Sequence, residues 1–222
     1  MIQLENELIS IKTELLNMWI LVQSQLEKTR QAMVNFDKDL AHEVVIKEKR
    51  VNAYELKIDR DCENIFALYC PVAVDLRFLL AVLKINSNLE RIGDIAEGIS
   101  KHVIDSPAYF DKKILEQTEL LKMFEDAIGI LADTRLAFEK EDTALARSIF
   151  KRDESLDRIN KEVNDNVTKL IKEDLKYVSE SLYAISIVRK LERVGDQSKN
   201  IAEEIIFYLE AKVLKHQKGD KI

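Results

Sequence analysis

The sequence predicts an all-α protein built from two tandem antiparallel three-helix bundles. The 222 residues include only 5 glycines and 2 prolines, too few for the frequent turns of a many-stranded sandwich or barrel. Apolar residues recur every three or four positions along almost the whole chain, which is the helical period. A motif at Leu89–Asp94 returns as Leu191–Asp196, at an offset of 102. Such a repeat indicates two copies of one structural unit.

Six helical segments are expected. The first contains the apolar run Leu15–Val22, which is far shorter than a membrane span and is read as a core face with Trp19 packed inside. Pro71 suits the first turn of the third helix, and 106–110 is the clearest break in the helical pattern. Segments of about 30 residues joined by short connections favour antiparallel bundles. The predicted helices are 4–34, 37–69, 71–105, 111–138, 141–174 and 178–214, and the predicted bundles are 1–105 and 109–215.

The third and sixth helices each carry a heptad seam, a stripe of residues that faces the core. The seams are Ile85, Leu89, Ile92, Ala96, Ile99 and Val103 in the third helix, and Ile187, Leu191, Val194, Ser198 and Ile201 in the sixth. In this frame the two acids of each repeated motif, Glu90 with Asp94 and Glu192 with Asp196, lie one turn apart on the outward side.

The helix before each seam carries a second acidic pair in matching heptad positions. Tyr54 and Ile58 lie on the seam of the second helix, and Leu156 and Ile159 lie on that of the fifth. We therefore predict a first acidic set on the second and third helices and a second acidic set on the fifth and sixth. The first set is Glu55, Asp59, Glu90 and Asp94, and the second set is Asp153, Asp157, Glu192 and Asp196.

Paired acids in these positions point to cation binding. Like charges four residues apart on a helix repel, and two such pairs on neighbouring helices repel more strongly unless cations lie between them. Carboxylates with no histidine or thiolate beside them form a hard oxygen site, which suits Mg²⁺, Mn²⁺, Ca²⁺ or Fe³⁺ better than structural zinc. A lone acidic pair on a helix is usually a solvated face. Four pairs in matched positions are much less readily explained in that way.

Two other residue types recur beside the acids. Gly93 and Gly195 lie within helices, where glycine is destabilising by about 1 kcal/mol relative to alanine. They indicate either the close approach of a neighbouring helix or room for a bound cluster. Arg91 and Arg193 lie near the acidic edge, and we expect them to neutralise carboxylates of an adjacent helix rather than to act on a ligand.

Charge and cysteine usage restrict the classes of function. The net charge of −6, with no basic run, is unfavourable for a nucleic-acid binder. Cys62 and Cys70 do not have a metal-binding spacing and are expected to be reduced, as in a cytoplasmic protein. The first residues lack the layout of a signal peptide. No Gly-rich phosphate-binding loop or catalytic triad is evident, so we expect no catalytic or cofactor-binding residues. No arginine cluster with helix N-termini is evident either, so direct phosphate binding is not expected.

Taken together, these residues resemble the PhoU family of phosphate-uptake regulators. The matching segments cover nearly the whole chain and both repeats: 51–59, 71–77, 89–94, 153–157, 191–196 and 200–203. The resemblance implies two three-helix bundles related by a pseudo-two-fold axis. It also implies that the acidic motifs hold metal at the surface, with multinuclear iron favoured and Mn, Mg, Zn or Ca as alternatives.

The resemblance further implies a non-enzymatic cytoplasmic regulator. Such a protein would link the ATPase of a phosphate ABC transporter to a sensor histidine kinase and repress the phosphate-starvation response when phosphate is plentiful. It would form a homodimer or larger oligomer and meet the membrane only through its partners. The two halves differ at one place, since 97–101 lacks the Asn-Ile-Ala-Glu pattern of 200–203. That departure allows the two metal sites to differ in nuclearity.

Two other readings stay open. A helical adaptor that binds no metal would leave the acidic sets merely solvated. A ferritin-like di-iron enzyme would need Glu-x-x-His motifs that project into the core. The three histidines, His42, His102 and His216, follow no glutamate at that spacing, which argues against the enzyme.

Overall fold

The structure is a computed structural model that describes residues 2–214. These residues form long antiparallel helices and contain no strand, which confirms the predicted all-α class. The helices are α1 (Ile2–Asn35), α2 (Lys38–Tyr69), α3 (Ala73–Asp105), α4 (Lys112–Gln117), α5 (Leu120–Lys140), α6 (Thr143–Glu173) and α7 (Val178–Glu210), with a 3₁₀ turn at Leu175–Tyr177. His216 and the predicted end of the second bundle at residue 215 lie outside the described residues.

Some of the predicted helices have different bounds in the structure. The last, predicted at 178–214, ends at Glu210. Pro71 precedes α3, which begins at Ala73. The expected helix 111–138 is two helices, because Glu119 adopts a left-handed conformation with φ 48° between α4 and α5. Arg158 of α6 donates to both carboxylate oxygens of Glu119 at 2.9 Å. This contact from another helix holds the break in place, and local periodicity could not predict it.

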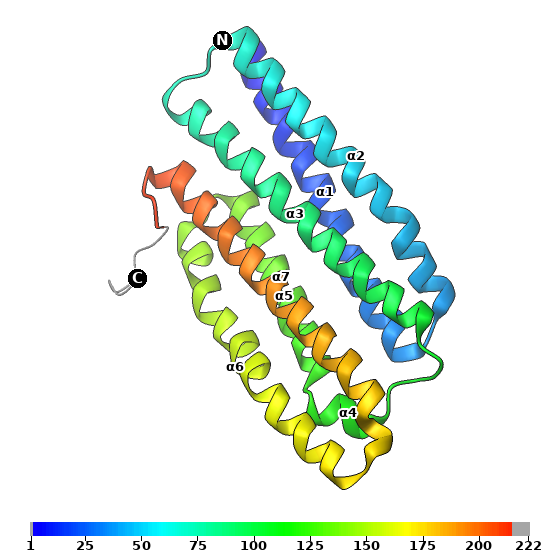
Figure 1. The fold of residues 1–222 in the computed structure, drawn as a ribbon. Coiled ribbons are helices and arrows are strands. Elements are labelled where there is room, and N and C mark those ends of the chain that lie inside the picture. Colours follow the sequence, from blue (N-terminus) through cyan, green and yellow to red (C-terminus); the bar gives the residue numbers. More distant parts are fainter. Residues whose placement is uncertain (1, 215–222) are drawn as a thin grey trace.

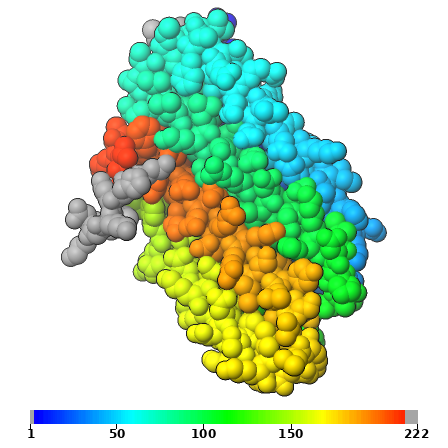
Figure 2. Space-filling model, viewed as in Figure 1, coloured from blue at the N-terminus to red at the C-terminus, as the bar shows by residue number. Residues whose placement is uncertain are grey.

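The long helices form two layers (Figure 1). Helices α2, α3, α7 and α6 lie side by side in one layer, and α1 and α5 pack behind them. Helices α1, α2 and α3 form one bundle, and α5, α6 and α7 repeat the arrangement. The space-filling view shows α3 and α7 running together between α2 and α6 (Figure 2). The two copies of the repeated motif therefore lie on neighbouring central helices.

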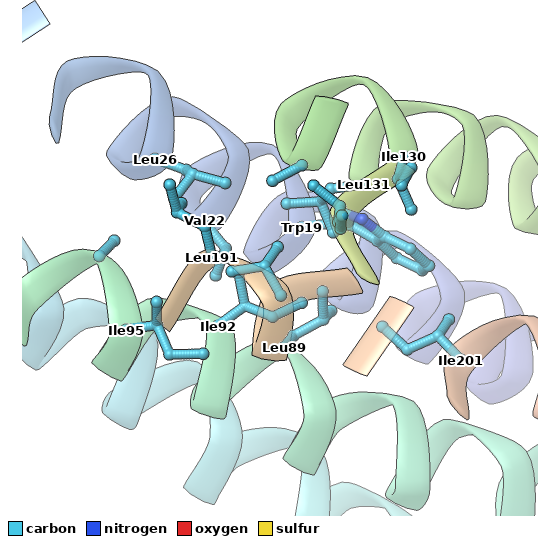
Figure 3. Packing of buried hydrophobic residues seen from close by; sticks show 14 of the residues in the cluster. Trp19, Val22, Leu26, Leu89, Ile92, Ile95, Ile130, Leu131, Leu191 and Ile201 are labelled. Atoms are coloured by element: carbon cyan, nitrogen blue, oxygen red, sulfur yellow. The ribbon is translucent and has the colours of Figure 1, made fainter. Parts of the chain in front are cut away.

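Buried apolar side chains from both halves form one continuous core. The predicted seams of α3 and α7 are buried along their length, and Trp19 is fully buried, as expected. Figure 3 shows Trp19 of α1 in this core together with Leu89 and Ile92 of α3, Leu131 of α5 and Leu191 of α7. No helix within residues 2–214 is long and apolar enough to cross a lipid bilayer.

The two cysteines differ sharply in accessibility, and both are free thiols. Cys62 is fully buried, and burial raises the pKa of its thiol to about 12. Cys70 is exposed at the end of α2. We predict that a thiol reagent at pH 8 labels Cys70 at least 100-fold faster than Cys62, because only the ionised, accessible thiol reacts. Mass spectrometry of the labelled native protein measures this ratio, with urea-unfolded protein as the control in which the two rates converge.

Candidate functional site

The buried seams turn the predicted acids toward the edges between helices. On α3 the seam residues Leu89 and Ile92 are fully buried, so Glu90 and Asp94 emerge beside α2. On α7 the seam residues Leu191 and Val194 are likewise fully buried, so Glu192 and Asp196 emerge beside α6. Each acidic set therefore lies along the boundary of one helix pair within the four-helix layer.

The acids of the first set lie near enough to one another for their charges to interact. Burial raises the pKa of Glu55, and the charges of Asp59 and Asp94 raise it further. Burial and the charges of Asp94 and Glu55 raise the pKa of Glu90 to about 7. Asp94 is exposed, while the other three side chains are partly buried. Repulsion across the α2–α3 boundary is thus present in the protein without a cation.

Two polar residues that the sequence reasoning missed support this set. Glu48 lies one heptad before Glu55 and is only 6% exposed, and the charges of Asp94 and Glu97 act on it. Asn52 donates to its Oε2 at 2.8 Å, but Oε1 has no hydrogen-bond partner within residues 2–214. The fully buried Asn86 donates to the Oδ1 of Asp59 at 2.9 Å and to the backbone oxygen of Glu55 at 3.0 Å. The seven-residue spacing of Glu48 and Glu55 was the available signal for Glu48.

Glu90 gives the cation-free protein a distinct pH dependence. Its pKa is near 7 in the folded protein and 4.5 in the reference state, so the folded protein binds more protons between these values. We predict that this group makes the chelator-treated protein less stable as pH rises from about 4.5 to 7. Urea unfolding at several pH values with EDTA present measures the slope, and Glu90→Gln should flatten it. An unchanged slope in that variant would contradict the shifted pKa.

The second acidic set contains its own cation. The Nζ of Lys199 lies 2.5 Å from Asp153 Oδ2 and 2.9 Å from Asp196 Oδ1. These hydrogen bonds outweigh the effect of burial and raise the pKa of Lys199 above its ordinary value. Burial and the charges of Asp196 and Asp157 raise the pKa of Glu192, and Lys199 opposes that shift. All four carboxylates of the set are therefore within reach of one another's charges.

The outward position expected for Asp153 was wrong. Its side chain is 2% exposed, and burial raises its pKa despite the ammonium beside it. Its Oδ1 has no hydrogen-bond partner among the described residues. The heptad position of Asp153 predicts only the direction in which its side chain leaves α6. Because Gly195 of α7 has no side chain, the Asp153 carboxylate can pack against α7.

The two motif glycines admit neighbouring helices. A Cβ at Gly195 would overlap the Asp153 carboxylate and the Leu156 methyl of α6, and a Cβ at Gly93 would lie 3.1 Å from Val51 Cγ1 of α2. Of the two explanations for these glycines, close helix packing is the one that the contacts support.

The two motif arginines differ in their surroundings. Arg91 is exposed, and its charge lowers the pKa of Glu55 across the helix boundary, as expected. Arg193 lines a shallow groove of about 390 Å³ between α6 and α7 together with Arg189 and Lys190. Burial lowers the pKa of Lys190, and the charges of Lys101 and Arg193 lower it further. The expected neutralising role therefore fits Arg91 but not Arg193.

The carboxylates of each set lie along one helix pair, but they are not arranged to coordinate an ion. Within residues 2–214 no group of three or more His, Cys, Asp or Glu side chains is arranged to hold a metal. In the first set, the oxygen donors, the unpartnered Glu48 Oε1 and the mutual repulsion all fit a hard cation, which would draw the side chains together. In the second set, the Lys199 ammonium already forms ion pairs with two of the carboxylates and offsets one of their two charges.

Large apolar side chains are exposed near two turns, the one that joins α2 to α3 and the one that joins α6 to α7. Leu68 and Val72 are 74% and 71% exposed at the α2–α3 turn, and Leu175 and Leu182 are 77% and 62% exposed near the α6–α7 turn. The α2–α3 turn and the α6–α7 turn lie at opposite ends of the molecule (Figure 1). Exposed apolar groups that adjoin one another in a patch, unlike single ones, are typical of surfaces that bind other proteins.

Comparison with known proteins gives a consistent result over nearly the whole chain. A family model described as the PhoU domain matches residues 15–103 and 120–205. The chain is 33% identical to the phosphate-specific transport system accessory protein PhoU of Edwardsiella tarda, over 99% of this chain and 90% of that protein. The corresponding protein of Escherichia coli K12 is 32% identical with the same coverage. A crystal structure of PhoU from Pseudomonas aeruginosa superposes with a TM-score of 0.87, at 29% identity, over 94% of this chain and 99% of that one.

Proposed function

This chain belongs to the PhoU family, and from that premise we propose that it is a non-enzymatic accessory protein of a phosphate-specific transport system that restrains phosphate uptake. The observation that carries the proposal is the match over both repeats to relatives named as accessory proteins of a phosphate-specific transport system, which the chain covers to about nine-tenths of their length. The names of these relatives denote an accessory protein and not an enzyme.

In this proposal the protein acts by contact with other proteins. It binds the ATPase of the phosphate ABC transporter and a sensor histidine kinase, works in the cytoplasm as a homodimer, and reaches the membrane only through these partners. The apolar side chains exposed near Leu68 and Leu182 support a role in protein binding.

Deletion of the gene in its own organism tests the regulatory role. We expect the deletion strain, grown in high phosphate, to take up radiolabelled phosphate faster than its parent and to keep a phosphate-starvation reporter switched on. A plasmid copy should restore both. A deletion strain with normal uptake and a silent reporter would contradict the proposal.

We also propose that the acidic surface binds a hard metal ion, with iron favoured from the family resemblance. In the first acidic set, Glu55 and Asp59 of α2 would hold the ion together with Glu90 and Asp94 of α3. The ion would supply positive charge between carboxylates that now repel, and it would link the two helices. The fit of the donor set and the unpartnered Glu48 Oε1 support this assignment.

Metal analysis separates this proposal from a metal-free helical adaptor. Protein purified without chelators should contain metal, and the double variant Asp94→Ala/Asp196→Ala should contain less while keeping its helical circular dichroism. A metal-free preparation whose melting temperature does not respond to Fe³⁺, Mn²⁺, Mg²⁺ or Zn²⁺ would favour the adaptor. The regulatory role would survive that result, because the family match does not depend on metal.

A further inference from the structure

We propose that the two acidic sets are not equivalent: the first is the cation site, and the ammonium of Lys199 takes the place of a metal in the second. This inference rests on the cation binding proposed above and assigns it to one half of the molecule. It departs from the symmetric pair of sites that the repeat predicts.

The position of Lys199 is the first argument. Its Nζ lies between Asp153 of α6 and Asp196 of its own helix, at 2.5 Å and 2.9 Å. These are the two helices that a metal would link. The ammonium therefore already supplies the charge and the cross-helix contact expected of a metal. A divalent cation would have to displace it from a carboxylate that is 2% exposed.

The repeat-equivalent residue of the first half has the opposite charge. At the offset of 102, Lys199 corresponds to Glu97, so a carboxylate stands where the second half has an ammonium. Glu97 pairs with Lys101 at 2.7 Å, one turn further along α3. Lys101 in turn corresponds to Glu203, so the two halves place their ammonium groups at different positions, and only the second half has one at the position of Lys199.

Two further differences act in the same direction. Asn86 corresponds to Val188 at the offset of 102, and Glu48 corresponds to Ala146 at the offset of 98 that relates Glu55 and Asp59 to Asp153 and Asp157. Ala146 and Val188 are both fully buried apolar residues. Each half has a buried carboxylate oxygen with no hydrogen-bond partner among the described residues, Glu48 Oε1 in the first and Asp153 Oδ1 in the second. The other oxygen of Asp153 pairs with the Lys199 ammonium, whereas that of Glu48 accepts only from the neutral amide of Asn52. The second half has neither the additional carboxylate nor the amide that orients an acid.

Manganese titration of matched variants tests the assignment. EDTA-treated, dialysed protein is titrated with Mn²⁺, and bound ion is followed by electron paramagnetic resonance and native mass spectrometry. We expect Glu90→Gln/Asp94→Asn to weaken Mn²⁺ binding at least tenfold, and the matched pair Glu192→Gln/Asp196→Asn to leave it within twofold. Glu97→Lys, which copies the second half into the first, should also weaken binding at least tenfold.

The reverse change should create a second site. Lys199→Met removes the ammonium, and we expect it to add a second class of bound Mn²⁺ that Glu192→Gln/Asp196→Asn abolishes. Lys199→Arg, which keeps the charge, should add none. Circular dichroism checks that each variant is folded, and the Glu97→Lys result decides the assignment should Lys199→Met fail to fold.

The outcomes separate the two proposals. Wild-type binding that is lost on neutralising Glu192 and Asp196, or kept in Glu97→Lys, would overturn the asymmetry while leaving cation binding in place. A folded Lys199→Met protein with no added Mn²⁺ would do the same. Wild-type protein that binds no Mn²⁺ would overturn the proposed cation binding itself, and this inference with it.

Discussion

Replacing Lys199 with methionine is expected to lower the free energy of unfolding of the cation-free protein by about 3 kcal/mol at pH 7. The Asp153 side chain is only 2% exposed. The substitution removes the ammonium that pairs with this buried carboxylate. Removing one partner of a buried ion pair is strongly destabilising, because the remaining charge loses both its solvent and its counterion. Methionine preserves most of the side-chain volume, so the effect reports the charge.

Urea unfolding at pH 7 with EDTA present measures this loss. The companion variant Asp153→Asn/Lys199→Met removes the stranded charge and should recover most of the stability. The loss should also shrink at pH 4, since protonation of Asp153 removes the unpaired charge. If Lys199→Met alone is as stable as the wild type, the ion pair between Lys199 and Asp153 does not stabilise the fold.

Replacing Gly195 with alanine is expected to destabilise the protein by about 2 kcal/mol. The added Cβ would overlap the Asp153 carboxylate and the Leu156 methyl, both on α6, so α6 and α7 would have to separate. The better helix propensity of alanine, about 1 kcal/mol, offsets only part of this strain.

Gly98→Ala is the matched control. A Cβ at Gly98 of α3 would meet the Nζ of Lys190 at 2.8 Å, which is the mobile end of a long side chain that can move aside. This variant should therefore be as stable as the wild type or up to about 1 kcal/mol more stable. Thermal unfolding of the two variants measures the difference, and equal effects would contradict close packing at Gly195.

Helical periodicity predicted the long helices and their buried seams because each of these depends on spacing within one segment. The seams through Leu89 and Leu191 are buried as expected. The break at Glu119 could not be predicted in this way, since it depends on Arg158, which is 39 residues away along the chain.

The same distinction holds for the acidic sets. Matched heptad positions predicted which carboxylates share a boundary, but they did not show what lies between them. The burial of Asp153 depends on the space left by Gly195 of another helix. The contact between Lys199 and Asp153 joins residues 46 positions apart. Glu48 was overlooked because it has no counterpart in the second half, where the equivalent residue is Ala146.

The central position of α3 and α7 has a consequence for cooperativity. Each of these helices packs against its own bundle and also against the other, and their seams belong to one core. Separating the halves would uncover the apolar surface along this shared contact, so neither half is expected to persist alone. Heating should therefore melt residues 2–214 in a single two-state transition, and a fragment ending in the loop after α3 should aggregate rather than fold.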